Sequence, residues 1–254
     1  MDQVQNPWLH LPNEAPFIAP GDVEAVAALN VRASRTADHR HRFRLQTQLL
    51  PDPFTGRVDA PVVLWTANPG YTDNERARRW GPDIQSDDFW HSRSEDLWEC
   101  YRRNLRHEAQ AYPLFFLNPR LRGSPGHRCY TRQFRNLIDD CGDKQVARHV
   151  LVVEEFPYHS REYPSGWRMP SQAYSHFLMR KAVERGALII ALRARRALLE
   201  MVPEVRGARV LGRRSRNPAL SPGNLDGYGE IVERIRSESQ PGEPSACKAT
   251  AGNR

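Results

Sequence analysis

The stretch Pro61-Val-Val-Leu-Trp-Thr-Ala-Asn68-Pro69-Gly70-Tyr71 is an apolar run that ends in a turn. Apart from Thr66, the residues from Val62 to Ala67 are apolar or aromatic, and a run that is apolar on both faces is typical of a central strand in a parallel sheet. Asn68-Pro69-Gly70 then ends the strand, because proline has no N–H to donate and glycine tolerates turn conformations. Ligands of parallel α/β sheets bind at the carboxyl ends of the strands, so the stretch predicts a ligand site at Asn68 to Tyr71.

Strand and helix patterns alternate along the rest of the chain. Further strands are predicted over residues 114–117, 149–156, 187–192 and 209–211. Helices are predicted over residues 22–30, 86–107, 132–141, 171–185, 194–201 and 225–235. This alternation predicts an α/β fold, a three-layer αβα sandwich with a central, mainly parallel sheet of four to five strands.

Residues 1–236 are predicted to form a single domain. Within it, residues 1–48 form an N-terminal arm and a helix packed on the domain, and residues 31–48 alternate arginine and histidine with few apolar side chains, which slightly favours a helix. Residues 237–254 are rich in Ser, Pro, Gly and Glu without periodicity, and we expect a disordered tail there.

The chain has 254 residues and a formal net charge of +7, and arginine supplies nearly all of its positive charge. No acidic residue occurs from Ala109 to Ile138, whereas five arginines do. Arginine suits bidentate contact with phosphate, so the distribution favours a nucleic-acid partner. A genome-wide bias towards arginine is the alternative explanation for the total charge.

Several classes of protein are disfavoured by what the sequence lacks. The four cysteines form no CxxC pair, and the histidines show no HExxH-like spacing, so we expect no metal site and a reducing, cytoplasmic location. There is no signal-peptide pattern at the N-terminus and no apolar run of membrane-spanning length. Without a glycine-rich phosphate loop or a GxSxG motif, we expect no nucleotide cofactor and no serine hydrolase.

If the strands are parallel, the segments that follow them converge on one edge of the sheet. These segments begin at Asn68, Asn118, Glu154, Arg193 and Arg213. Asn68-Pro69-Gly70 at the end of a strand resembles the first motif of the uracil-DNA glycosylase superfamily, nearest the single-strand-selective monofunctional branch. Three further segments match that family in the same order over about residues 49–236. They are Val152-Val-Glu-Glu-Phe-Pro157, Ala187-Leu-Ile-Ile-Ala-Leu-Arg-Ala-Arg-Arg196 and Arg216-Asn217-Pro218.

The resemblance implies a monomeric DNA-repair hydrolase that binds single- or double-stranded DNA and cleaves the N-glycosidic bond of a flipped, deaminated or modified base without a cofactor. Asn68 would be the catalytic residue and would hold the attacking water. The base pocket would comprise Pro69, Gly70, Tyr71, Glu154, Glu155, Phe156 and Tyr158. DNA would be bound by Arg213, Arg214, Arg216, Asn217, Leu220 and Asn224, with Leu220 as an apolar wedge into the duplex.

The chain departs from the family at two places. The last motif usually contains a histidine that donates to the departing base, and Gly212-Arg213-Arg214-Ser215 stands in its place. Where the family reads the base with an asparagine, this chain has Glu154 or Glu155, and only one of two adjacent strand residues can face the pocket. An ionised glutamate only accepts hydrogen bonds, which predicts a base edge rich in N–H donors.

Other interpretations of these residues remain open at the level of the sequence. A protein that kept the fold and binds nucleic acid without catalysis is the main alternative, and a small-molecule binder is a third. Glu154 and Glu155 could instead pair with Arg148 or Arg193. His159 and His176 are expected on the surface or on a helix face rather than in catalysis.

Overall fold

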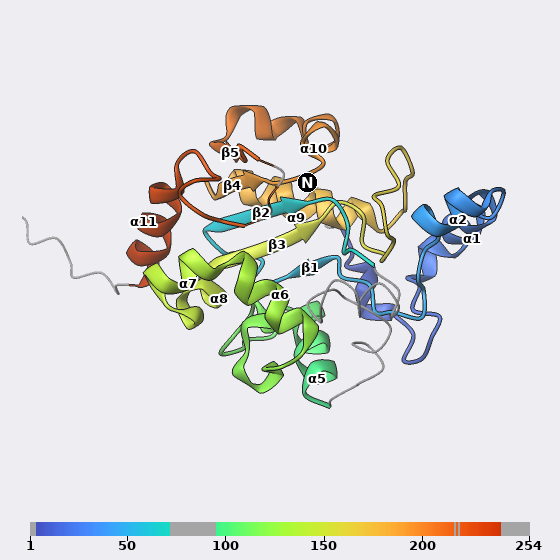
Figure 1. Cartoon of the computed structure of the whole chain (residues 1–254), viewed down its shortest axis with the longest axis horizontal. Helices are drawn as coiled ribbons and strands as arrows, with labels where there is room; N and C mark the ends of the chain where they lie inside the picture. Colours follow the sequence, from blue (N-terminus) through green and yellow to red (C-terminus); the bar gives the residue numbers. More distant parts are fainter. Residues whose placement is uncertain (1–3, 72–94, 216, 218, 240–254) are drawn as a thin grey trace, which may run out of the picture.

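The computed structural model describes residues 4–71, 95–215, 217 and 219–239. Within them the chain forms a mixed, mostly parallel sheet in the order β1-β3-β2-β4-β5 (Figure 1). The strands are β1 (Phe54–Thr55), β2 (Val62–Thr66), β3 (Val150–Glu154), β4 (Leu188–Ala191) and β5 (Val210–Gly212). The α/β class and the mainly parallel sheet predicted from the sequence are therefore confirmed.

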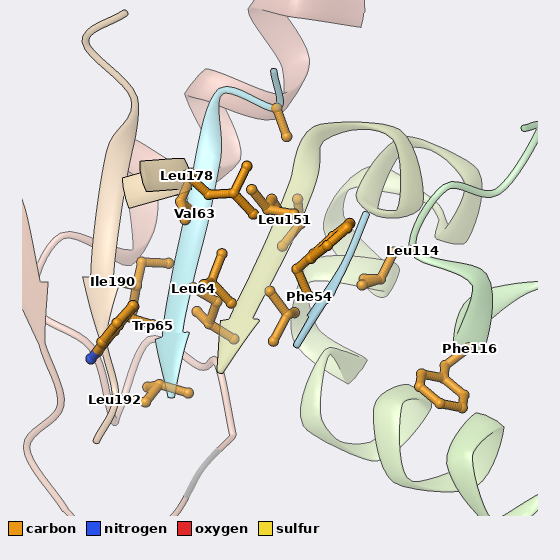
Figure 2. Packing of buried hydrophobic residues seen from close by; sticks show 14 of the residues in the cluster. Phe54, Val63, Leu64, Trp65, Leu114, Phe116, Leu151, Leu178, Ile190 and Leu192 are labelled. Carbon is orange, nitrogen blue, oxygen red and sulfur yellow. The ribbon is translucent and has the colours of Figure 1, made fainter. Parts of the chain in front are cut away.

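Strand β2 lies in the middle of the sheet, as its apolar run predicts. Val62 is in register with Val150 of β3 on one side and with Leu188 of β4 on the other, and both pairings are parallel. The four residues from Val62 to Trp65 are fully buried. Figure 2 shows Leu64 and Trp65 packed among apolar side chains of β3 and β4, and burial of each such side chain contributes roughly 1.5–3 kcal/mol. This packing fixes the point at which Asn68 emerges.

Helices connect and cover the strands. They are α1 (Val23–Ala33), α2 (Ala37–Phe43), α5 (Glu95–Leu105), α6 (Pro125–Gln133), α7 (Arg135–Cys141), α8 (Asp143–His149), α9 (Gln172–Glu184), α10 (Arg195–Met201) and α11 (Tyr228–Ser239). Short 3-10 helices occupy Pro7–His10, Pro20–Asp22, Phe115–Leu117, Pro119–Leu121 and Pro203–Gly207. No helix in this described part of the chain is long and apolar enough to span a membrane.

Two predictions about strands are wrong. The apolar run at residues 114–117 is not a strand but a buried 3-10 turn, and a run of four apolar residues cannot distinguish the two. A strand that was not predicted occurs at β1, after Pro51 and Pro53, and it pairs antiparallel with β3. Gly56 directly after β1 has φ of 121°, and a Cβ there would lie 2.4 Å from the carbonyl oxygen of Val150, so the close approach of the two strands requires glycine.

The helix predictions hold for α1, α7, α9, α10 and α11, with shifted ends. Helices α6 and α8 were not predicted; α6 begins after Ser124, whose side chain accepts a hydrogen bond from the His127 amide. The predicted helix over 86–107 is described only as α5, because its first part lies outside the described residues. The predicted tail begins inside α11, and its remainder from residue 240 also lies outside them.

The N-terminal segment is held to the domain by a buried tyrosine. The Tyr158 hydroxyl donates to the Asp22 carboxylate at 2.7 Å and accepts from the Ala19 amide at 3.0 Å. The Phe17 amide also donates to the carbonyl of Thr47 at 2.7 Å. These contacts place the segment that precedes α1 beside the end of β3.

Candidate functional site

Asn68 lies just beyond the carboxyl end of β2, and hydrogen bonds to Ser160 hold its amide group in place. The Nδ2 group donates to the Ser160 carbonyl at 3.0 Å and to the Ser160 hydroxyl at 3.1 Å, with a longer contact of 3.3 Å to the carbonyl of Pro69. Among the described residues, no hydrogen bond occupies Oδ1, and the side chain is half-buried. An asparagine held in this way presents a preoriented acceptor to a small ligand such as water.

The backbone after Asn68 is open on one side. Pro69 is buried, whereas Gly70 is exposed and forms a parallel bridge with Ser160. No described atom lies within 4 Å of a Cβ built on Gly70, and its φ is not in the left-handed region. Tyr71 is half-buried and packs against the core. The turn at Gly70 therefore has room beside it for a ligand, and its backbone is not strained.

Glu154, at the end of β3, lies beside Thr66 in the parallel register and is only 7% exposed. Its Oε2 atom is buried and has no hydrogen-bond partner among the described residues. Burial and the neighbouring Asp52 raise the pKa of Glu154 well above its ordinary value, and a hydrogen bond with Thr66 and the charge of Arg193 oppose this only in part. This environment favours the neutral, protonated form of Glu154 over the ionised acceptor predicted from the sequence.

Glu155 points to the other face of the sheet, as strand alternation requires. One carboxylate oxygen contacts the His176 Nε2 atom at 3.0 Å, and the other accepts from the Gln172 amide at 3.1 Å and lies 3.7 Å from Arg168. The expected partners Arg148 and Arg193 are not used. Glu155 joins β3 to α9, so of the two glutamates only Glu154 is left to face the candidate site.

A second buried acid, Asp52, lies near Glu154, and no pattern in the sequence predicted it. Asp52 is 3% exposed, and its carboxylate accepts a hydrogen bond from the Thr55 hydroxyl at 2.8 Å. Burial raises the pKa of Asp52 to about 6. Tyr130 of α6 is buried nearby, and burial together with Asp52 and Glu154 raises the pKa of its hydroxyl. These groups are separated by many residues in the sequence, so only the fold brings them together.

Arg161 is a further residue that was not predicted. It follows Ser160, the partner of Asn68, and it is half-buried. Its Nη2 atom is buried, and no described residue accepts a hydrogen bond from it. A buried guanidinium nitrogen without a described partner, one residue after Ser160, is suited to an anion such as a phosphate.

Two of the aromatic residues predicted for the base pocket have other roles. Phe156 is fully buried and meets the Tyr158 ring edge-on, with ring centroids 6.2 Å apart. Tyr158 is 1% exposed and anchors the N-terminal segment through its hydroxyl. Neither ring has a free face for a base in this structure, which leaves Tyr71 as the predicted aromatic residue with an accessible part.

The predicted DNA-binding loop after β5 is organised by Asn224. This residue is 4% exposed and uses both ends of its amide, donating to the carbonyls of Asn217 and Ala219 and accepting from Ser215. The prediction that Asn224 contacts DNA is therefore replaced by a role in shaping the loop. Its neighbour Asn217 is exposed.

The arginines and the predicted wedge of this loop differ in exposure. Arg214 is exposed and paired with Asp226, and Arg213 is half-buried in a bridge with Leu225. Arg216 lies outside the described residues. Leu220 is fully buried, and its amide donates to the carbonyl of Gln133. A wedge requires an exposed apolar side chain, and Leu220 does not meet that requirement.

His176 lies on a helix face, that of α9, as expected, whereas His159 lies neither on the surface nor on a helix. Both ring nitrogens of the buried His159 lie 3.0 Å from carbonyl oxygens, those of Gly70 and Leu50. Burial lowers the pKa of His159 to about 4. His176 is buried against Glu155 and Trp65. Both histidines are part of the scaffold behind the candidate site.

A separate cavity of 590 Å³ lies at the opposite edge of the sheet, where β3 begins, and is lined by His107, Arg148 and His149 among others. Its histidines are occupied: His107 bonds the Tyr174 hydroxyl at 2.6 Å, and His149 contacts the carbonyl of Gln145 at 2.9 Å. Within the described residues, no cluster of His, Cys, Asp and Glu could hold a metal ion. We therefore take the carboxyl ends of β2 and β3 as the candidate functional site.

Comparisons of the chain with protein-family models, with curated proteins and with solved structures found no match.

Proposed function

We propose that this protein is a DNA glycosylase-like enzyme, which hydrolyses the N-glycosidic bond of a base flipped into the site formed by Asn68 and Glu154. The observation that carries the proposal is the state of Asn68. Its amide Nδ2 is bonded to Ser160, and no residue in the described part of the chain bonds its Oδ1 beyond the carboxyl end of the central strand. This supports a water-holding role, which is the role that the resemblance to uracil-DNA glycosylases implies.

In the proposed reaction, Oδ1 of Asn68 accepts a hydrogen bond from a water beside C1′ of the sugar. The bond between C1′ and the base nitrogen breaks, and the base leaves with the electron pair. The water oxygen bonds to C1′, and one water proton finally resides on the departing base. Negative charge grows on the base during this step, so donors fixed in a water-poor site accelerate it.

Glu154 narrows the class of base. A neutral carboxyl group donates through its O–H and accepts through its C=O, as an amide does. It therefore suits an edge on which a carbonyl stands next to an N–H, as in uracil or hypoxanthine. This replaces the prediction of an N–H-rich edge, because that prediction assumed an ionised glutamate.

The alternative is a nucleic-acid-binding protein without catalysis. It is favoured by one observation, the absence of histidine from Gly212-Arg213-Arg214-Ser215. Removing one such donor costs roughly a hundred- to a thousandfold in rate. In the enzyme proposal Arg213 supplies a fixed positive charge instead, and Arg214 contacts DNA phosphates when DNA displaces it from Asp226.

Two finer expectations belong to the same proposal. The helices would complete a three-layer αβα sandwich around the sheet. The protein would act as a monomer in a reducing, cytoplasmic compartment, in keeping with four scattered cysteines that form no CxxC pair.

The test is incubation with single- and double-stranded oligonucleotides that carry a panel of deaminated and modified bases, followed by alkaline cleavage of abasic sites. We expect strand breaks with a base of the uracil or hypoxanthine type. No strand breaks on any substrate, with DNA binding retained, would support the non-catalytic alternative.

A matched pair of variants tests the role of Glu154. Glu154→Gln keeps one donor and one acceptor and should leave the base preference unchanged, whereas Glu154→Ala should abolish the preference. Glu155→Gln, on the other face of the sheet, serves as the control, because it changes the contact with His176 but not the site. Equal base preference in the wild type and Glu154→Ala would remove Glu154 from the pocket.

A further inference from the structure

A groove lies between helices α1 and α2 and the segment 162–167. It encloses 350 Å³, and its walls include Arg32, Arg42, Phe43, Tyr163 and Trp167. We call these five residues and the space between them the arginine–aromatic groove. None of the five belongs to the candidate site described above.

The groove pairs aromatic rings with guanidinium groups. The Arg32 guanidinium lies over the Trp167 ring, 5.4 Å from its centroid, and the Arg42 guanidinium lies over the Phe43 ring at 5.0 Å. Phe43, Tyr163 and Trp167 are each half-buried, so part of every ring is accessible. Aromatic rings that stack with bases, next to arginines that contact phosphates, are the means by which proteins bind unpaired nucleic acid.

The surface beside the groove is strongly basic. Residues 31–44 contain five arginines and a single acid, Asp38. Arg42 is paired with Asp38 and Glu162, whereas Arg35, Arg40 and Arg44 are exposed and form no ion pair within the described part of the chain. Helix α2 buries none of its side chains, so core packing does not explain the alternation of arginine and histidine in its sequence.

Backbone contacts join the walls of the groove to the segment that holds Asn68. The Glu162 amide donates to the carbonyl of Arg42 at 2.9 Å, and only Arg161 separates Glu162 from Ser160, which holds Asn68. The amide of Gln46 similarly donates to the carbonyl of His159 at 2.9 Å. In Figure 1, α1 and α2 stand at the edge of the molecule beyond the carboxyl ends of β2 and β3.

We propose that the arginine–aromatic groove binds an unpaired nucleotide of a DNA strand that extends from the candidate site. Its base lies against Phe43, Tyr163 and Trp167, and the neighbouring phosphates contact Arg35, Arg40 and Arg44. The choice of DNA rests on the proposed function. The need for an unpaired strand comes from the groove, because bases within a duplex cannot reach its aromatic walls.

The test is the fluorescence anisotropy of a labelled oligothymidine titrated with the full chain. Trp167→Ala should weaken binding roughly tenfold, because it removes a stacking surface. Arg35→Ala with Arg40→Ala should weaken binding and reduce its dependence on salt. Arg196→Ala on α10, which removes an exposed arginine paired with Glu200, should bind as the wild type does.

Phe43→Leu provides a second variant in case Trp167→Ala unfolds, which circular dichroism would reveal. Affinity equal to that of the wild type in a folded Trp167→Ala or Phe43→Leu variant would overturn the proposal. Binding of a polyglutamate peptide as tightly as oligothymidine would also overturn it, because the basic surface would then act without stacking. Equally tight binding of a blunt duplex would do the same.

The outcome is separate from that of the proposed function. Asn68→Ala should bind oligothymidine as the wild type does, since it leaves the groove intact. If the wild type releases no base but Trp167→Ala still loses oligothymidine binding, the groove proposal stands and the enzyme proposal fails. If the wild type releases base and Trp167→Ala binds normally, only the groove proposal fails.

Discussion

Replacing Asp52 by asparagine should stabilise the protein above about pH 6. Asp52 is buried, and its pKa is raised by that burial from an ordinary 3.8 to about 6. The folded state therefore binds the proton more tightly than the unfolded chain does. Below the unfolded pKa both states are protonated and the carboxyl imposes no electrostatic penalty, but stability is lost as pH rises through the folded value.

The size of the expected gain in stability follows from the pKa shift of Asp52. A change of about 2 pKa units at ~1.4 kcal/mol each gives about 3 kcal/mol of lost stability once Asp52 is ionised. Asparagine removes the charge and still offers an oxygen to the Thr55 hydroxyl, which donates to Asp52 at 2.8 Å. The variant should therefore gain about 3 kcal/mol over the wild type at about pH 8 and almost nothing at about pH 4.

Urea denaturation of both proteins across this pH range measures the difference in the free energy of unfolding. Asp59→Asn is the control, because Arg57 lowers the pKa of the exposed Asp59, and its removal should cost stability above about pH 4 rather than add it. A difference between Asp52→Asn and the wild type that does not change with pH would refute the reasoning. So would a wild type that is the more stable protein at about pH 8.

Three further predictions concern the scaffold. Gly56→Ala should destabilise by more than about 2 kcal/mol, because of its φ of 121° and the clash with the neighbouring strand, whereas Gly70→Ala should leave the melting temperature unchanged; equal melting of both variants would contradict this. Tyr158→Phe removes the hydrogen bonds to Asp22 and Ala19 and should cost roughly 1–3 kcal/mol, measured by denaturation; no loss would mean that the hydroxyl does not anchor the N-terminal segment. Leu220→Ala should cost about 2–5 kcal/mol as a core residue, and a neutral result would restore Leu220 as a surface wedge.

The sequence predicts correctly the strands in which successive residues are all buried. Strands β2, β3 and β4 were predicted because each is an apolar run that lies between neighbours in a parallel sheet. Strand β1 was missed because only two of its residues pair and prolines precede them. Residues 114–117 were misassigned because a short buried run has the same composition in a strand and in a 3-10 turn.

The candidate site was predictable only in part, for a similar reason. The position of Asn68 follows from the end of β2, and strand alternation indicates that only one of Glu154 and Glu155 faces the site. Which one does so depends on α9, whose His176 pairs with Glu155. The raised pKa of Asp52 and the unpaired group of Arg161 depend on burial between distant segments, which no local pattern records.

In the proposed reaction, Asn68 holds the water that attacks C1′ when the glycosidic bond is cleaved. The most direct measurement is a single-turnover reaction of the wild type and Asn68→Ala with an oligonucleotide that carries uracil or hypoxanthine, in which released base and alkali-labile sites are both counted. We expect the wild type to produce equal amounts of free base and abasic sites. We expect at least a hundredfold slower release with Asn68→Ala (roughly the cost of losing one fixed polar group in an active site), with DNA binding retained. Release of base at the same rate by both proteins would show that Asn68 does not hold the attacking water.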